Sequence, residues 1–99
     1  MGLHLKVSDE MLSLQFDSMA DVHKFTDTVD SVLASAMVLG KRIDEAPYKA
    51  VNDAIKTGGV LFAEFPIALW TEKVSCPSWA GTSIVVPFSV LVLSKLGLL

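Results

Sequence analysis

The sequence predicts a single α+β domain over residues 1–99, with two helices packed on one face of a mainly antiparallel sheet. Three observations support this prediction. Two short N-terminal runs alternate apolar and polar residues, two later segments repeat apolar residues every three or four positions, and β-branched residues gather near the C-terminus. In chain order the elements read roughly ββααβ(β)β. Ninety-nine residues can build one two-layer core, but not two independent ones.

The first two runs predict a β-hairpin. Residues 3–7 (LHLKV) and residues 11–16 (MLSLQF) alternate strictly, and the polar residues 8–10 (SDE) between them favour a turn. One face of this hairpin is therefore expected to be apolar and the other to be polar and exposed to solvent. The apolar face would carry Leu3, Leu5, Val7, Leu12, Leu14 and Phe16.

A long helix is predicted from Ser18 to Gly40. Ser18 followed three residues later by Asp21 resembles a capping box with Asp in place of Glu, and Gly40 favours a helix end. Residues at spacings of three and four form one apolar stripe. They are Val22, Phe25, Val29, Val32, Leu33, Ala36 and Met37.

A second, shorter helix is predicted next. Asp44 or Glu45 would cap it, Pro47 suits its first turn, and Gly58 with Gly59 would end it. Its buried stripe would consist of Tyr48, Val51 and Ile55.

The C-terminal half predicts further strands. Residues 59–65 read as a strand, residues 67–74 as its continuation past a proline bulge or as a separate edge strand, and residues 75–82 as a loop. Residues 82–99 are apolar on both faces and rich in β-branched residues, which favours a covered strand. Pro87 leaves open an edge position, a bulge, or a break into a short helix.

Composition excludes several classes of protein. The net charge of −3 and the pI of about 5.1 argue against binding to nucleic acid, which is driven by cationic side chains. The hydrophobic share of 52% against 19% charged residues excludes a disordered chain. It also suggests more apolar surface than a monomer of this size hides.

Residues 82–99 contain a single charge, Lys95, and so raise the question of a membrane anchor. Serines and Pro87 interrupt the apolar run and no cationic flank precedes it, so we expect a strand of the fold and no membrane insertion. Cys76 is the only cysteine, so no intrachain disulfide can form, and no secretory pattern opens the sequence. We therefore expect a cytoplasmic protein.

The chemistry-bearing residues do not form a recognisable catalytic pattern. Neither His4 nor His23 is predicted to pair with a carboxylate that would orient it as a general base. With Cys76 they do not make a zinc pattern, and Cys76 has no strongly basic neighbour to form a thiolate. We expect no catalytic residue, no metal and no cofactor.

The apolar C-terminal third is the predicted interaction surface. Tryptophan is favoured at interaction hot spots, and a strand that is apolar on both sides needs a cover, for which a second copy is the simplest choice. The candidate interface residues are Trp70, Trp79, Pro87, Phe88, Val90 and Val92.

The sequence thus predicts a non-enzymatic protein–protein interaction or assembly protein, with a protein partner or a second copy of itself. An oligomeric subunit, an adaptor and a small inhibitor all fit, including one of viral origin. Two alternatives stay open: a membrane-associated protein anchored by residues 82–99, and a small ligand-binding or enzymatic domain.

Overall fold

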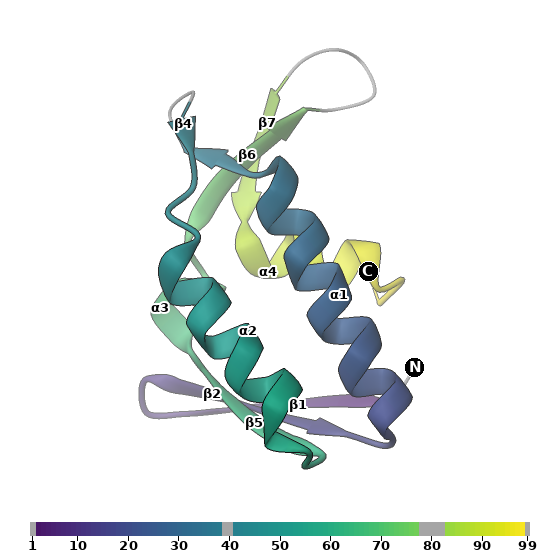
Figure 1. The fold of residues 1–99 in the computed structure, drawn as a ribbon. Helices are drawn as coiled ribbons and strands as arrows, with labels where there is room; N and C mark the ends of the chain where they lie inside the picture. Colours follow the sequence, from purple (N-terminus) through teal and green to yellow (C-terminus); the bar gives the residue numbers. More distant parts are fainter. Residues whose placement is uncertain (1, 39–40, 78–82, 99) are drawn as a thin grey trace.

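A computed structural model describes residues 2–38, 41–77 and 83–98 of the chain. It confirms the α+β class and the antiparallel pairing, and it refines the predicted single sheet into two. The first sheet has the order β1-β2-β5 and the second the order β4-β3-β6-β7. In Figure 1 the first sheet lies at the lower end of the helices α1 and α2, and the β6–β7 hairpin projects at the opposite end.

The first sheet contains the predicted N-terminal hairpin. Strands β1 (Leu3–Ser8) and β2 (Met11–Phe16) pair with Leu5 opposite Leu14, and Asp9 makes the turn with a φ of 54°. Strand β5 (Phe62–Pro66) pairs with the other side of β2, which confirms most of the strand predicted at residues 59–65. The sheet therefore ends in β1 on one side and β5 on the other.

The second sheet is built from short strands. Its members are β3 (Met37–Val38), β4 (Lys41–Arg42), β6 (Lys73–Pro77) and β7 (Ser83–Pro87). Met37 of β3 lies opposite Ser75 of β6, and β6 pairs with β7 along its whole length. The loop predicted at residues 75–82 is thus a strand as far as Pro77, and the rest of it lies outside the described residues.

Helix α1 (Met19–Ser35) begins as predicted and ends early. The Ser18 hydroxyl accepts a hydrogen bond from the Asp21 N–H at 3.3 Å, which is the expected cap. The predicted end at Gly40, itself outside the described residues, is wrong. Ala36 turns to extended backbone (φ −79°, ψ 144°) because the residue after it joins the second sheet, and sheet pairing outweighs helix propensity there.

Helix α2 (Ala46–Gly58) agrees with the prediction at both ends. The Asp44 carboxylate accepts a hydrogen bond from the Ala46 N–H at 3.2 Å, and Pro47 stands in the first turn. Gly59 follows the helix in the left-handed conformation with a φ of 65°, which glycine adopts without strain. The chain then reverses into β5.

Two prolines end strands and begin helices, and this corrects the C-terminal predictions. Residues Ile67–Trp70 form the one-turn helix α3, and Phe88–Lys95 form the helix α4. The strand predicted at 67–74 is wrong over its first half, and the strand predicted at 82–99 is right only for β7. Pro66 and Pro87 lack the N–H that a continuing ladder needs, and both have a φ of −57°, which suits a helix start. Of the three alternatives for Pro87, the structure therefore shows the third, in which the strand ends and a short helix begins.

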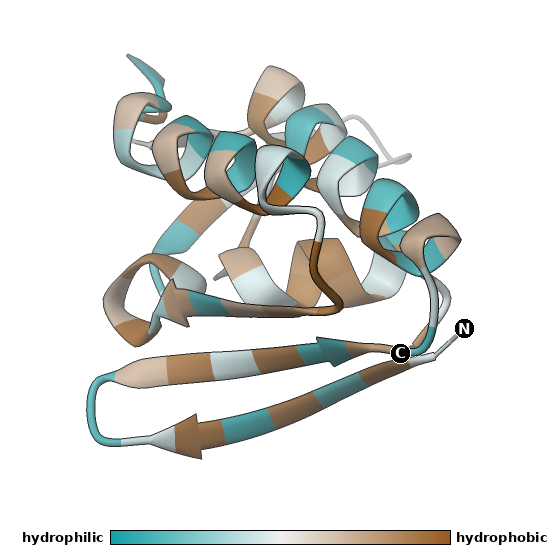
Figure 2. Ribbon diagram, turned by 60° about the horizontal axis from the view of Figure 1, so that its bottom comes forward, coloured by the Kyte–Doolittle hydropathy of each residue, from teal (hydrophilic) through white to brown (hydrophobic). Residues whose placement is uncertain are grey.

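The core lies between the first sheet and the four helices. An aromatic cluster fills its centre, with the Tyr48 and Phe88 rings 4.6 Å apart and the Phe65 and Trp70 rings 5.7 Å apart. Figure 2 shows the apolar residues of α1 and α2 on the sides that face inward. Among the residues that the structure describes, no helix is both long enough and apolar enough to cross a membrane.

Candidate functional site

Exposed apolar side chains gather along the two outer strands of the first sheet. Of the seven large apolar side chains that are exposed among the described residues, five lie in β1, in the two residues before β5 or at the first residue of β5. They are Leu5, Val7, Val60, Leu61 and Phe62. Such a concentration on one sheet is typical of a binding surface, because single apolar residues are normally scattered.

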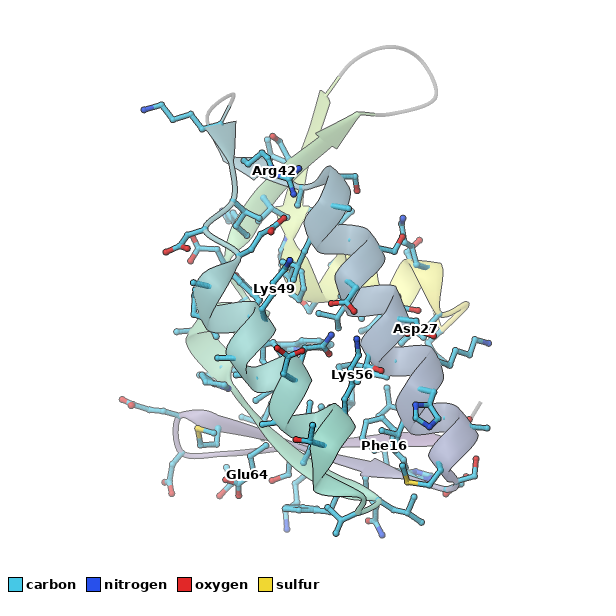
Figure 3. All side chains as sticks on the ribbon, viewed as in Figure 1. Phe16, Asp27, Arg42, Lys49, Lys56 and Glu64 are labelled. Carbon is cyan, nitrogen blue, oxygen red and sulfur yellow. The ribbon has the colours of Figure 1, made fainter. Side chains whose placement is uncertain are left out.

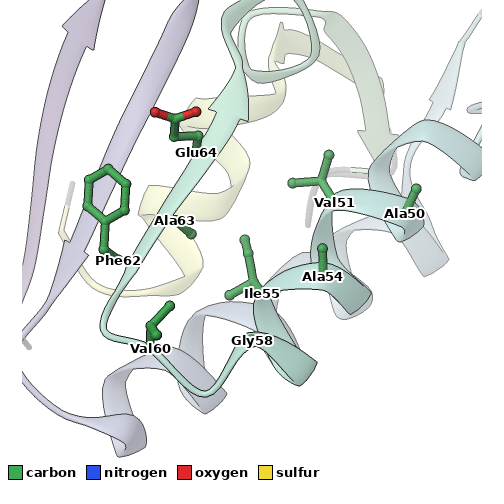
Figure 4. A pocket seen from close by; sticks show the side chains of 9 residues that line it. All are labelled: Ala50, Val51, Ala54, Ile55, Gly58, Val60, Phe62, Ala63 and Glu64. Atoms are coloured by element: carbon green, nitrogen blue, oxygen red, sulfur yellow. The ribbon is translucent and has the colours of Figure 1, made fainter.

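A groove with a volume of about 390 Å³ runs between α2 and β5. In Figure 4, residues of α2 form one wall, and the chain from Val60 to Glu64 forms the other. Among the described residues that line it, Glu64 alone is charged. The lining consists of Ala50, Val51, Ala54, Ile55, Gly58, Val60, Phe62, Ala63 and Glu64.

The local sequence explains the shape of this groove. Ala50, Ala54 and Gly58 recur every four residues and so share one face of α2, where their small size leaves space. Gly59 then turns the chain back so that β5 runs beside the helix. The groove is therefore open because of the small residues on this face.

The backbone of β5 also faces the groove. Hydrogen-bonded and non-bonded pairs alternate in an antiparallel ladder, and the Phe16 N–H donates to the Leu61 C=O at 2.8 Å. By this alternation Ala63 and Phe65 bond to β2, whereas the N–H and C=O of Phe62 and Glu64 point away from it. No strand pairs with this edge of β5 within the part of the chain that the structure describes. The groove thus combines an apolar lining with backbone groups that can pair with a peptide.

The outer edge of β1 has the same character. The Asp17 N–H donates to the Gly2 C=O at 2.9 Å, so by the same alternation the backbone groups of Leu3, Leu5 and Val7 point away from β2. Leu5 is 43% exposed and Val7 is 61% exposed, although both share a face with the buried residues of β2. The predicted apolar face of β1 is therefore real, and much of it is uncovered.

His4 and Asp17 form a side-chain contact that the sequence did not predict. His4 Nε2 lies 3.1 Å from Asp17 Oδ1, so the prediction that neither histidine would pair with a carboxylate is wrong for His4. Both side chains are more than 60% exposed, which makes the pair weak and poorly positioned. Asp17 is the one hydrogen-bond partner of the His4 ring among the described residues, so no nucleophile is held against it.

The structure does not bring the other residues considered for catalysis or metal binding into one site. His23 is exposed and lines a shallow depression with Lys24, Asp27 and Lys95. The Cys76 side chain lies outside the described part of the structure. Among the residues whose placement is described, no group of three or more His, Cys, Asp or Glu side chains could hold a metal ion.

Three of the six predicted interface residues are buried. Trp70 is 5% exposed, and Phe88 and Val92 are fully buried, so a partner cannot contact them without opening the core. Pro87 and Val90 are half-buried, and Trp79 lies outside the described residues. The sequence contained a helical pattern that predicts this burial. Phe88, Val92 and Leu96 are spaced by four residues, and all three are buried on one side of α4 and its C-cap.

Polar contacts fix α2 to α1 on the side away from the groove. The Asn52 amide donates to the Thr26 C=O at 3.0 Å and to the Asp30 carboxylate at 2.9 Å, and Lys56 donates to Asp30 at 2.5 Å. The hydrogen bond to Asp30 raises the pKa of Lys56 above its ordinary value. Figure 3 shows Lys49 on α2 and Lys56 between the two helices. The charges of α2 thus lie away from the groove.

A second set of charges joins the start of α2 to β4. Arg42 and Lys49 both pair with the Glu45 carboxylate. The hydrogen bond from Arg42, with a smaller contribution from Lys49, lowers the pKa of Glu45. Because these side chains are engaged with one another, they form a structural network at the surface.

No protein-family model, curated protein or solved structure matches this chain.

Proposed function

We propose that this protein is a non-enzymatic interaction or assembly protein that binds an extended segment of a partner protein along the α2–β5 groove. The observation that carries the proposal is the unpaired edge of β5 inside an apolar groove. An extended peptide that adds to a sheet edge gains backbone hydrogen bonds, and pockets beside the edge select its alternate side chains.

The lining defines the chemistry of the partner. The N–H and C=O groups of Phe62 and Glu64 would pair with the backbone of the peptide, and the small residues of α2 would receive every second side chain. Glu64 favours a basic side chain at the position beside it, since it is the charged residue of the described lining. The expected ligand is an extended segment with alternating apolar residues and one Lys or Arg.

The proposed class of function is the one that the sequence predicts, but the proposed binding surface is a different one. The predicted interface included Phe88 and Val92, which instead lie in the core of the chain. The groove uses residues 50–64 and leaves that core intact.

Selection from a display library of short random peptides tests the proposal. We expect the wild-type protein to enrich sequences that alternate apolar residues and contain one basic residue. Ala54→Asp places a charge on the groove wall and should weaken binding of the enriched peptides by about tenfold or more, because a charge would be buried against apolar side chains. Ala20→Asp is the matched control, since Ala20 is an exposed alanine of the other long helix.

The proposal fails if the wild-type protein enriches no common pattern. It also fails if the enriched peptides bind the Ala54→Asp and wild-type proteins equally well while the Ala20→Asp protein behaves as wild type.

A further inference from the structure

We infer that two copies of this chain pair edge to edge through β1, so that the two three-stranded sheets join into one antiparallel six-stranded sheet. This interface lies on the opposite edge of the sheet from the groove and does not depend on the partner proposed there. The occupant that we assign to the free edge of β1 is a second copy of the same strand.

The backbone geometry fixes the register of this pairing. Leu3, Leu5 and Val7 carry the N–H and C=O groups that point outward, so an antiparallel copy pairs best with Leu5 opposite Leu5 of the second copy. Leu3 then lies opposite Val7 of the second copy, and the reverse holds by symmetry. All of the outward backbone groups of β1 find partners in this register.

The same register covers the exposed apolar side chains. Leu3, Leu5 and Val7 share one face of β1, so they meet the same three residues of the second copy in directly opposite pairs. Leu5 and Val7, which are 43% and 61% exposed in one copy, would each gain an apolar neighbour. In the view of Figure 2, β1 is the strand of its sheet farthest from α1 and α2, which leaves room for a second sheet beside it.

Charge complementarity on the other face favours a second copy over an unrelated strand. The Asp17 carboxylate folds over Gly2, where an added Cβ would lie only 1.9 Å from Asp17 Oδ2. A negative charge therefore occupies the place that a side chain of residue 2 would take, and glycine is the residue that leaves this place open. The edge thus displays an acid at one end.

Lys6 supplies the opposite charge. It is exposed, and within the described residues it forms no ion pair. In the register above, Lys6 lies opposite His4 of the second copy and diagonal to its Gly2, within reach of the Asp17 carboxylate held there. By symmetry the dimer contains this Lys6–Asp17 pair twice.

A charge-swap experiment tests the pairing. In sedimentation velocity over a concentration series, we expect the wild-type chain to dimerise. Lys6→Glu puts two acids together and Asp17→Lys puts two cations together, so each variant alone should dimerise about tenfold more weakly. An equimolar mixture of the two variants restores both opposite-charge pairs and should recover association close to that of the wild type.

Asp53→Lys is the matched control, because it reverses an exposed acid on α2, outside the first sheet and outside the groove lining, and should leave the dimer unchanged. Both swapped side chains are exposed, so circular dichroism should show both variants folded. A wild-type chain that is monomeric at every concentration would overturn the inference. So would single variants that dimerise like wild type, or a mixture that associates no better than its components. None of these results would bear on peptide binding in the groove.

Discussion

At the scale of single residues, Tyr48 and Asn52 show how α2 is held in place. The Tyr48 hydroxyl donates to the Leu69 C=O at 2.9 Å, and its ring lies in the aromatic core. Asn52 is fully buried and donates two hydrogen bonds to α1, while its Oδ1 has no hydrogen-bond partner among the described residues. Both polar groups lie on the side of α2 that faces the core, so the groove face of the helix stays apolar.

Tyr48 gives the fold a dependence on alkaline pH. Burial, together with the nearby negative charge of Glu72, raises the pKa of Tyr48 above its ordinary value of 10.0. Above that pH the unfolded chain releases the phenol proton whereas the folded chain keeps it, so the free energy of unfolding falls as pH rises. The expected slope from this residue is about 1.4 kcal/mol per pH unit.

Urea unfolding of the wild-type and Tyr48→Phe proteins on both sides of pH 10 measures this effect. The variant should be less stable by about 1 kcal/mol at neutral pH, because it lacks the hydrogen bond to Leu69. It should lose less stability than the wild type as the pH is raised. Parallel pH profiles for the two proteins would show that Tyr48 is not held in its neutral form by the fold.

Only some of the contacts of single residues could be predicted from the sequence. The cap at Ser18 and the glycine after α2 could be predicted because each depends on its own few neighbours. The His4–Asp17 pair could not be predicted by spacing alone, since thirteen residues separate them and the hairpin register brings them together.

At the scale of elements, the two strand–proline–helix junctions differ most from the prediction, because helices follow Pro66 and Pro87 where strands were expected. At each junction the N–H after the proline bonds to a different part of the chain. The Ile67 N–H donates to the Glu10 C=O at 2.9 Å, and the Phe88 N–H donates to the Glu72 C=O at 2.7 Å. These contacts anchor the first turns of α3 and α4, which local β-propensity alone would not predict.

Two substitutions in α4 distinguish the helix from the predicted strand. In a strand, Val90 and Val92 would share a face and respond alike to a charge. In the helix Val92 is fully buried and Val90 half-buried, so Val92→Asp should cost about 3–5 kcal/mol and Val90→Asp clearly less. Thermal or urea unfolding of both variants measures the difference, and equal losses would support a strand.

The helices and the hairpin were predictable because each has a strong period of its own. The 3.6-residue stripe of α1 and the strict alternation in β1 and β2 need no distant contact to be recognised. Strands β3 and β4 have two residues each; β3 pairs with the edge of β6, and β4 pairs with β3. Such short elements carry no period, so the sequence could not reveal them.

At the scale of the whole molecule, the α+β class and the antiparallel pairing followed from the sequence, whereas the division into two sheets did not. Which strand remains at an edge depends on the order of strands in space. That order leaves β1 and β5 unpaired on their outer sides within the described residues. The groove and the β1 edge therefore became visible only in the assembled fold.

Within residues 2–38, 41–77 and 83–98, one sheet has two apolar edges without a pairing strand, one beneath α2 and one farther from both long helices. An exposed edge of this kind is normally blocked or used, because it templates pairing with another chain. In the two proposals above both edges are used, the β5 edge for a partner segment and the β1 edge for a second copy.

Amide hydrogen exchange measured at low and high protein concentration tests the assembly through β1 in the chain by itself. We expect the amides of Leu3, Leu5 and Val7 to exchange quickly when the protein is dilute and to become protected when it is concentrated. The amides of His4 and Lys6 already bond to β2 and should change little, which provides a control within the same strand. Exchange at Leu5 and Val7 that stays fast at every concentration would contradict assembly through β1.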